Sequence, residues 1–211
     1  MGESETALGA TLAESGASNV VVLEQTGTSR ADEVCGDLLT ATEPAATNLL
    51  GVTIGTAVDE WLSVWRSRAG DVDPARIGVV AAGDQVRRTA TAGGSGRADP
   101  TAGVSIETVT DPRDLTGIGV SVEKFLDAWA DAPGRIVADV DSVTALLAET
   151  SLERVFRFLH VLTGRFTAAD AVAHFHLTRD AHDEETVATL LPLFDAVVEI
   201  EDDGSVTVRQ D

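Results

Sequence analysis

Short apolar segments that alternate with amphipathic helical stripes are the feature of this sequence that most constrains its fold. Most of the segments are runs of Val, Ile, Leu and Ala rather than strict apolar–polar alternations, which is typical of strands buried on both faces. Strands that alternate with helices favour a mostly parallel sheet covered by helices on both faces. The predicted strands lie at residues 19–23, 49–54, 76–82, 104–109, 135–141, 171–177, 196–201 and 205–209. The last two flank Asp203-Gly204, so we predict an α/β fold with a C-terminal β-hairpin.

Three helices are predicted from apolar residues spaced i, i+3, i+4 and i+7. The first follows Thr56, the second is expected to begin at Ser121, and the third is expected to begin at Ser151. Trp61, Trp65 and Trp129 all fall in these stripes, so we expect them in the core. Shorter helices are predicted over residues 32–39 and 184–191, and a mobile surface loop over the small, polar residues 89–103.

The charge of the chain is strongly negative. It has 35 acidic and 15 basic residues, a net charge of −20, and a single lysine, Lys124. Such a surface repels itself at low salt, and molar salt removes this repulsion because the screening length falls to about 3 Å. The acidic residues are scattered along the chain, so we interpret them as adaptation to a halophilic cytoplasm. The same charge argues against non-specific nucleic-acid binding, which needs a basic surface.

Several classes of protein are excluded by what the sequence lacks. Cys35 is the only cysteine, so no internal disulfide or multi-cysteine metal site can form. No apolar stretch reaches the roughly 18 residues of a membrane span, and Met1 to Ser18 has no signal-peptide pattern. We expect a cytoplasmic protein with an N-terminal extension over residues 1–18 and a single α/β domain over residues 19–211.

The second half of the chain resembles a known family. The segment Arg135-Ile-Val-Ala-Asp-Val-Asp-Ser is similar to the Walker B region of RecA/KaiC-type ATPases, where an apolar strand ends in Asp-Ser. The long helix, the strand 171–177 that carries two histidines, and the segment 194–200 follow the same pattern. Residues 115–200 are also similar to uncharacterised proteins of salt-loving archaea that are identified as RecA-superfamily ATPases. The resemblance implies a RecA-like fold.

The phosphate-binding loop of that family is missing. The first strand should lead into G-x-x-x-x-G-K-[ST], whose backbone N–H groups and lysine bind the phosphates. This chain has Glu24-Gln-Thr-Gly-Thr-Ser-Arg30 instead, in which Gly27 alone matches, and its one lysine lies far along the chain. Without this loop the positioning and charge stabilisation of a transferred phosphoryl group both fail. We therefore expect no ATPase activity and no cofactor.

Two alternatives remain open at the level of sequence. A divergent loop could still bind ATP with Mg²⁺ in a nucleotide-binding regulator, through Gly27, Thr28, Ser29, Asp141 and Ser142. The simpler interpretation of Asp141 and Ser142 is that they cap the helix that follows the strand. The second alternative is a divalent-metal site built from His174, His176 and His182, because the first two point to one face of a strand.

The sequence therefore favours a non-catalytic RecA/KaiC-like protein, a pseudo-ATPase that has a regulatory or scaffolding role through protein–protein contacts. RecA/KaiC relatives assemble side by side, so the resemblance implies a protein partner or a homo-oligomer. Nothing in the sequence calls for a membrane or a nucleic acid as partner.

Overall fold

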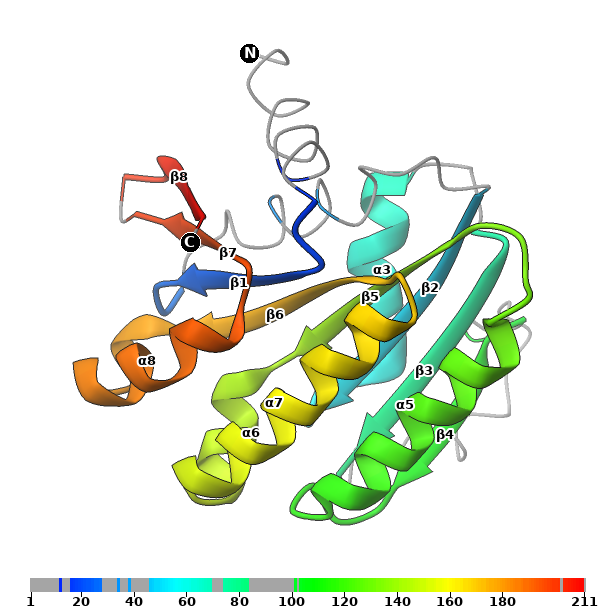
Figure 1. Cartoon of the computed structure of the whole chain (residues 1–211), viewed down its shortest axis with the longest axis horizontal. Helices are drawn as coiled ribbons and strands as arrows, with labels where there is room; N and C mark the ends of the chain where they lie inside the picture. Colours follow the sequence, from blue (N-terminus) through cyan, green and yellow to red (C-terminus); the bar gives the residue numbers. More distant parts are fainter. Residues whose placement is uncertain are drawn as a thin grey trace, which may run out of the picture.

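The computed structural model describes residues 12, 16–27, 34, 38, 46–69, 74–83, 101, 103–201 and 203–210. Within these ranges the chain forms one eight-stranded sheet flanked by helices (Figure 1). Most residues of the predicted helix over 32–39 and of the predicted loop over 89–103 lie outside the described residues, and so does Cys35. The division into an extension and a single domain stays a prediction.

The sheet has the strand order β4-β3-β2-β5-β6-β1-β7-β8. All neighbouring pairs are parallel except β7 and β8, which form the antiparallel hairpin. The predicted α/β class, with helices on both faces and a terminal hairpin, is confirmed. The strands are β1 (Asn19–Glu24), β2 (Thr47–Ile54), β3 (Arg76–Ala82), β4 (Ser105–Val109), β5 (Arg135–Asp141), β6 (Val172–Thr178), β7 (Ala196–Ile200) and β8 (Val206–Gln210).

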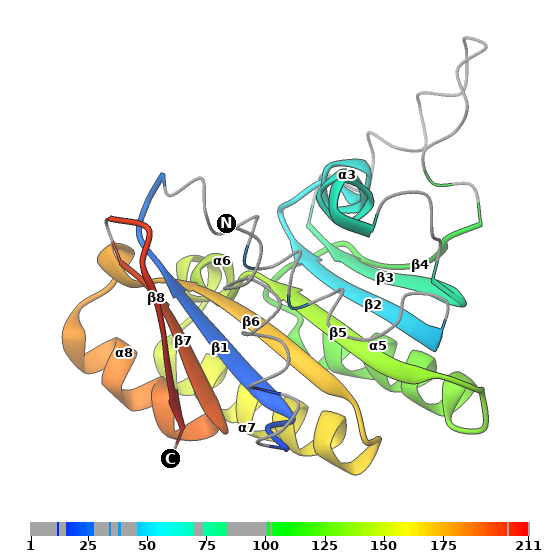
Figure 2. The same cartoon turned by 90° about the horizontal axis from the view of Figure 1, so that it is seen from above.

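The helices are distributed unequally over the two faces of the sheet. Figure 2 shows α3 on one side and α5, α6, α7 and α8 on the other. The helices are α3 (Val58–Ala69), α5 (Leu115–Trp129), α6 (Val143–Glu149), α7 (Leu152–Ala168) and α8 (Glu184–Leu190), with 3₁₀ turns η2 (Arg179–Ala181) and η3 (Leu191–Leu193). None of the helices in the described ranges is both long and apolar enough to cross a membrane.

One continuous apolar cluster fills the face that α5 to α8 cover. It includes the ring of Phe175 on β6, which contacts the rings of Phe166 on α7 and of Phe194. Strand residues alternate between the faces, so Leu50 belongs to this cluster while its neighbour Leu49 points to the other side.

The opposite face holds two smaller apolar clusters. One lies under α3 and contains Trp61 and Trp65; the other lies over β1 and β7 and contains Val20 and Val22. All three tryptophans are buried, as the sequence predicts. Between the two clusters the middle of the sheet, on β5 and β6, carries polar side chains, and these form the candidate site.

One predicted helix start is wrong. Ser121 does not begin a helix, because it is buried in the middle of α5. The helix begins six residues earlier, at Leu115, and the Asp114 carboxylate accepts a hydrogen bond from the backbone N–H of Gly117. Gly117 and Gly119 weaken the helical signal of this first turn, since glycine is a poor helix former. The cap at Asp114 offsets that weakness.

Candidate functional site

The candidate site lies where β5, β6 and β1 run side by side toward their carboxyl ends. Ligands of open parallel sheets bind at this edge. The register pairs Asp139 of β5 with His174 of β6, and Glu24 of β1 with Thr178 of β6. Side chains two residues apart share a face, so His174 and His176 both point to the side that carries α3.

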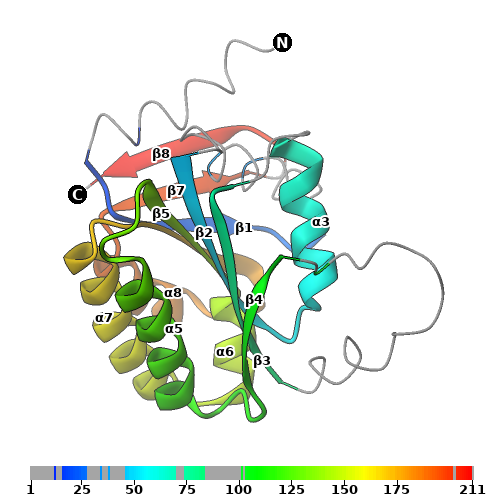
Figure 3. The ribbon, with the colours of Figure 1, turned by 90° about the vertical axis from the view of Figure 1, so that its right-hand side faces the viewer.

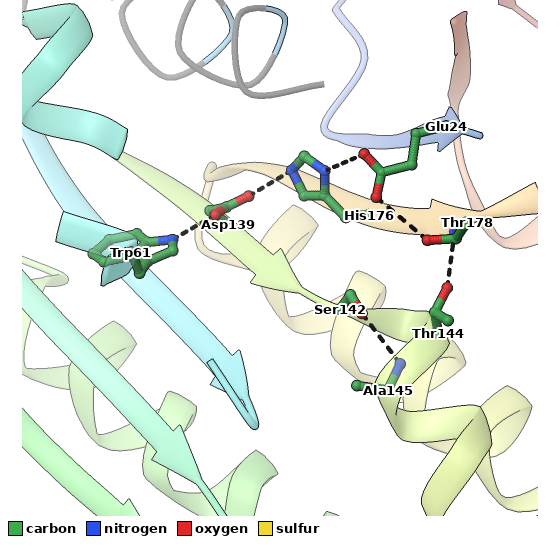
Figure 4. Close-up of polar contacts among 8 residues, drawn as sticks. All are labelled: Glu24, Trp61, Asp139, Ser142, Thr144, Ala145, His176 and Thr178. Carbon is green, nitrogen blue, oxygen red and sulfur yellow. Dashed lines mark hydrogen bonds and ion pairs between the residues drawn. The ribbon is translucent and has the colours of Figure 1, made fainter. Parts of the chain in front are cut away.

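A chain of polar contacts crosses these strands (Figure 4). The Trp61 indole N–H of α3 donates to Asp139 Oδ2 at 2.6 Å. The other carboxylate oxygen of Asp139 lies 3.0 Å from His176 Nε2, and His176 Nδ1 lies 4.0 Å from Glu24 Oε2. Thr178 then donates its hydroxyl to Glu24 Oε1 at 3.5 Å. We call Trp61, Asp139, His176 and Glu24 the polar network.

The network is largely shielded from solvent. The side chains of Asp139 and His176 are 2% and 8% exposed, and that of Glu24 is 18% exposed. Burial alone raises the pKa of the Asp139 carboxyl, but His176, Trp61 and His174 together hold that pKa below its ordinary value. Asp139 is therefore a buried, ionised carboxylate at neutral pH, held by the groups around it.

His174 lies next to the polar network, because it is paired in register with Asp139. It is fully buried, and within the described part of the structure its Nδ1 has no hydrogen-bond partner. Burial lowers the pKa of this imidazole from 6.5 to about 4, although the Asp139 charge opposes the shift. His174 is therefore neutral at pH 7.

Asp141 ends β5 at the same edge of the sheet. Burial, together with the negative charges of Asp139 and Glu24, raises the pKa of its carboxyl, against the opposing effect of a hydrogen bond with Thr56. Ser142 alone caps α6, by accepting a hydrogen bond from Ala145 N–H at 3.1 Å. The capping interpretation thus applies to Ser142. The Asp141 side chain instead lies close enough to Asp139 and Glu24 for their charges to raise its pKa.

The start of the loop after β1 is held by another carboxylate. Thr26 donates its backbone N–H and its hydroxyl to Asp180 Oδ1, at 2.9 and 3.0 Å. The backbone hydrogen bond from Thr26 lowers the pKa of Asp180. Gly27 has φ +80°, a left-handed conformation that glycine adopts without strain. Thr28 and Ser29 lie outside the described residues.

The three candidate metal ligands do not come together. His174 and His176 face the α3 side, whereas His182 lies with Leu23 and Val187 beside α8, on the other side of the sheet. Across the described ranges, no group of three or more His, Cys, Asp or Glu side chains has an arrangement that could hold a metal ion. His176 instead contacts the two acids of the network.

Lys124 lies far from this edge. Its ammonium group contacts Glu107 on β4 at 2.6 Å. Strands β3, β2, β5 and β6 separate β4 from β1 in the sheet. The only lysine of the chain is therefore remote from the carboxyl ends of β1 and β5.

Sequence reasoning did not connect several members of the site. The sequence predicts Trp61 only as a core residue, and Asp139 is not among the predicted site residues. Asp139 is buried, and it contacts a tryptophan 78 positions away in the chain. The available signal was the pattern of polar residues two apart on adjacent apolar strands, namely Asp139 with Asp141 and His174 with His176, which places all four on one face of the sheet.

The fold and the site define an α/β protein with a mostly parallel sheet, in which β1 and β5 end in acidic side chains. The chain belongs to a family described as a family of unknown function, DUF7504, whose model matches residues 17–200. No curated protein matches the chain.

Solved structures share the fold at low sequence identity. A Pyrococcus horikoshii protein, PH0250, is 14% identical, with a TM-score of 0.56 over 93% of this chain and 87% of that one. The uncharacterised P. horikoshii protein PH0321, solved with an unknown peptide, is 12% identical, with a TM-score of 0.57 over 90% and 81%. The flagellar accessory protein FlaH of Methanocaldococcus jannaschii is 11% identical, with a TM-score of 0.46 over 90% and 75%.

Proposed function

We propose that this chain is a non-catalytic RecA-like protein that acts through contacts with other proteins, in a regulatory or scaffolding role. The observation that carries the proposal is the gathering of Glu24, Asp139 and Asp141 at the carboxyl ends of β1 and β5. In a P-loop ATPase this edge receives the phosphates of the nucleotide. Here three acids occupy it, and two of them belong to a buried network.

Charge is the first reason why this edge suits a nucleotide poorly. A nucleoside triphosphate would bring several negative charges toward the acids. In a low-dielectric environment, like charges a few ångströms apart repel by several kcal/mol. Burial and then the charges of Asp139 and Glu24 raise the pKa of Asp141, so the acids at this edge already repel one another.

The engaged backbone N–H of Thr26 is the second reason. Phosphate-binding loops work by presenting free backbone N–H groups to the anion. The N–H of Thr26 already donates to the Asp180 carboxylate, so an internal carboxylate satisfies it where a phosphate would otherwise do so. This contact supports a loop whose role is structural.

A role through protein contacts also has support outside the site. One structural neighbour, PH0321, was solved in complex with an unknown peptide. We carry this to the present chain as a proposal: a RecA-like sheet of this kind can serve as a surface that binds polypeptide. The strongly acidic composition supports a halophilic cytoplasm as the place where it acts.

Ligand-dependent thermal unfolding tests the proposal. The protein is melted in molar KCl, where charge repulsion is screened, with and without Mg-ATP, Mg-ADP and Mg-GTP at millimolar concentration. A nucleotide at 100 times its dissociation constant would stabilise the fold by about 2.7 kcal/mol. We expect no shift with any nucleotide. A clear shift with one of them would overturn the proposal.

The alternative is a nucleotide-binding regulator that uses Gly27, Thr28, Ser29, Asp141 and Ser142. The turn at Gly27 and the position of Asp141 at the same sheet edge favour it. If it is correct, the thermal shift with Mg-ATP is present in the wild type and is lost in Asp141→Asn. The variant Asp127→Asn, on the outer side of α5, serves as the control and should leave the shift unchanged.

A further inference from the structure

A groove runs between α5 and α7 on the outer side of the helical layer. The two helices lie side by side in Figures 1 and 3. The groove has a volume of about 740 Å³, and its lining includes Val120 of α5 together with Phe158 and Val161 of α7. It is separate from the polar network, which lies on the other face of the sheet.

The groove exposes apolar side chains on both of its walls. Val120 is 54% exposed and Val161 is 59% exposed. Among the described residues the other exposed large apolar side chain is Ile106, at 37%. A single exposed valine is normal, but two on the two helices of one groove, with the half-buried Phe158 in the same lining, give the groove an apolar surface.

Gly119 keeps this groove open. A methyl group added at Gly119 would lie 3.8 Å from the Phe158 ring, an ordinary contact, so space does not require glycine there. Nor does the backbone, since Gly119 has no left-handed φ. Glycine is among the least favourable residues inside a helix. Its presence in the groove lining leaves room that a side chain would otherwise fill.

Basic side chains outnumber acidic ones in the lining of the groove, unlike in the chain as a whole. Four basic side chains and two acidic ones line it among the described residues: Lys124, Arg154, Arg157 and Arg165, with Glu123 and Asp127. The whole chain has 15 basic and 35 acidic residues. Three of the four basic side chains pair with carboxylates, Lys124 with Glu107, Arg157 with Glu153 and Arg165 with Glu123, and such exposed pairs are weak enough to exchange partners. An apolar groove with a basic rim is complementary to an apolar surface flanked by carboxylates.

We propose that this groove binds an acidic amphipathic helix of a partner protein. The occupant places apolar side chains spaced i, i+3, i+4 and i+7 against Val120, Phe158 and Val161. Its carboxylates lie toward Arg154, Arg157 and Arg165. The lining extends from Leu115 to Asp127, about 18 Å along α5, which suits about three turns of helix. The inference rests on the proposed function, because it names the kind of partner.

A peptide selection tests the inference. A displayed library of helical peptides of about fourteen residues carries fixed leucines at the i, i+3, i+4 and i+7 positions and random residues elsewhere. It is selected in parallel against the wild-type protein and against Gly119→Met, which fills the groove with a good helix former. We expect enrichment of Asp and Glu at the random positions on the wild type, and loss of these peptides on Gly119→Met.

Direct binding of one enriched, fluorescently labelled peptide completes the test. Affinity should fall at least tenfold in Gly119→Met and about threefold in Arg157→Glu, in line with the modest strength of exposed charge pairs. The matched control Glu185→Arg, on α8, should bind like the wild type. Equal binding to wild type and Gly119→Met, absence of any enrichment, or enrichment of Lys and Arg would overturn the inference.

Two further outcomes distinguish this inference from self-association and from the proposed function. A wild-type dimer in light scattering that Gly119→Met dissociates would make the occupant a second copy and would overturn the proposal of an acidic partner helix. A nucleotide-induced thermal shift with unchanged peptide binding would overturn the proposed function alone. Loss of peptide binding as a result of misfolding is detected by the melting temperature of Gly119→Met, which we expect to equal or exceed that of the wild type.

Discussion

The two faces of the sheet differ in how their interiors are built. The face under α5 to α8 has one continuous apolar cluster. The face under α3 has two smaller clusters, separated by the buried polar positions Asp139, His174 and His176. Polar groups in the interior cost free energy unless they are hydrogen-bonded or paired. The face under α5 to α8 should therefore contribute more to stability. The face under α3 has less apolar packing, because polar side chains occupy its middle.

Leu49 and Leu50 offer the largest test of this contrast. They are neighbours on β2, both fully buried, and they point to opposite faces. Leu50→Ala should lower the free energy of unfolding by about 4 kcal/mol, because the continuous core cannot collapse around the cavity. Leu49→Ala should cost about 2 to 3 kcal/mol, because a smaller cluster relaxes more easily. Urea unfolding in molar KCl measures both, and equal costs would contradict the contrast.

The pH dependence of stability tests the polar face. His174 has a pKa of about 4 when folded, against 6.5 for an unperturbed histidine. Below pH 6.5 the unfolded chain binds a proton that the folded chain does not bind until about pH 4. The free energy of unfolding should therefore fall by about 3 kcal/mol as the pH drops through this window.

The variant His174→Gln isolates that contribution, since it removes the titrating group and leaves Asp139, Asp141 and His176 in place. The loss of stability between about pH 6.5 and pH 4 should be smaller in the variant by about 3 kcal/mol. Urea unfolding at a series of pH values supplies the comparison. Identical pH profiles for the two proteins would show that His174 is not buried in its neutral form.

Two glycines test how tightly each face packs. A Cβ at Gly51 would lie 2.8 Å from the Trp61 indole, and a Cβ at Gly78 would lie 2.6 Å from the Phe125 ring on the other face. Each alanine variant should lose about 1 to 3 kcal/mol through overpacking. Gly51→Ala alone should also shift the indole N–H resonance of Trp61, because it displaces the ring that bonds Asp139. A shift of similar size in Gly78→Ala would show that the two faces are not independent.

Helix caps give the smallest expected effect. Ser142 caps α6 with its side chain, whereas Ser151 stands at the start of α7 without a side-chain cap bond. Ser142→Ala should cost about 1 kcal/mol, and Ser151→Ala a few tenths at most. Thermal melts of both variants measure the difference. A larger loss from Ser151→Ala would contradict the assignment of the cap.

The sequence predicts the framework well because that framework depends on local patterns. The apolar runs place every strand to within two or three residues, and the Asp203-Gly204 turn places the hairpin. The start of α5 differs from the predicted start because Gly117 and Gly119 weaken the local helical signal, and the cap at Asp114 offsets them. Here a side-chain cap, rather than periodicity, sets the boundary.

The candidate site is less predictable because it depends on contacts between distant parts of the chain. Asp139 meets Trp61 across 78 positions, and Thr26 meets Asp180 across 154. The sequence does place Asp141, His174 and His176 on predicted strands, and it shows that the phosphate loop is absent. It does not show that His176 bridges two acids, since strand order decides this, and strand order follows from packing of the whole sheet.

The proposed function depends on the acids and their partners at the carboxyl ends of β1 and β5, the sheet edge where P-loop ATPases bind phosphate. Isothermal titration of Mg-ATP into the wild-type protein in molar KCl tests this dependence most directly. A second sample, Asp180→Asn, replaces the carboxylate that accepts the backbone N–H of Thr26. The account predicts no saturable binding to the wild type at millimolar nucleotide. Saturable binding with a dissociation constant well below a millimolar, lost in Asp141→Asn, would contradict it.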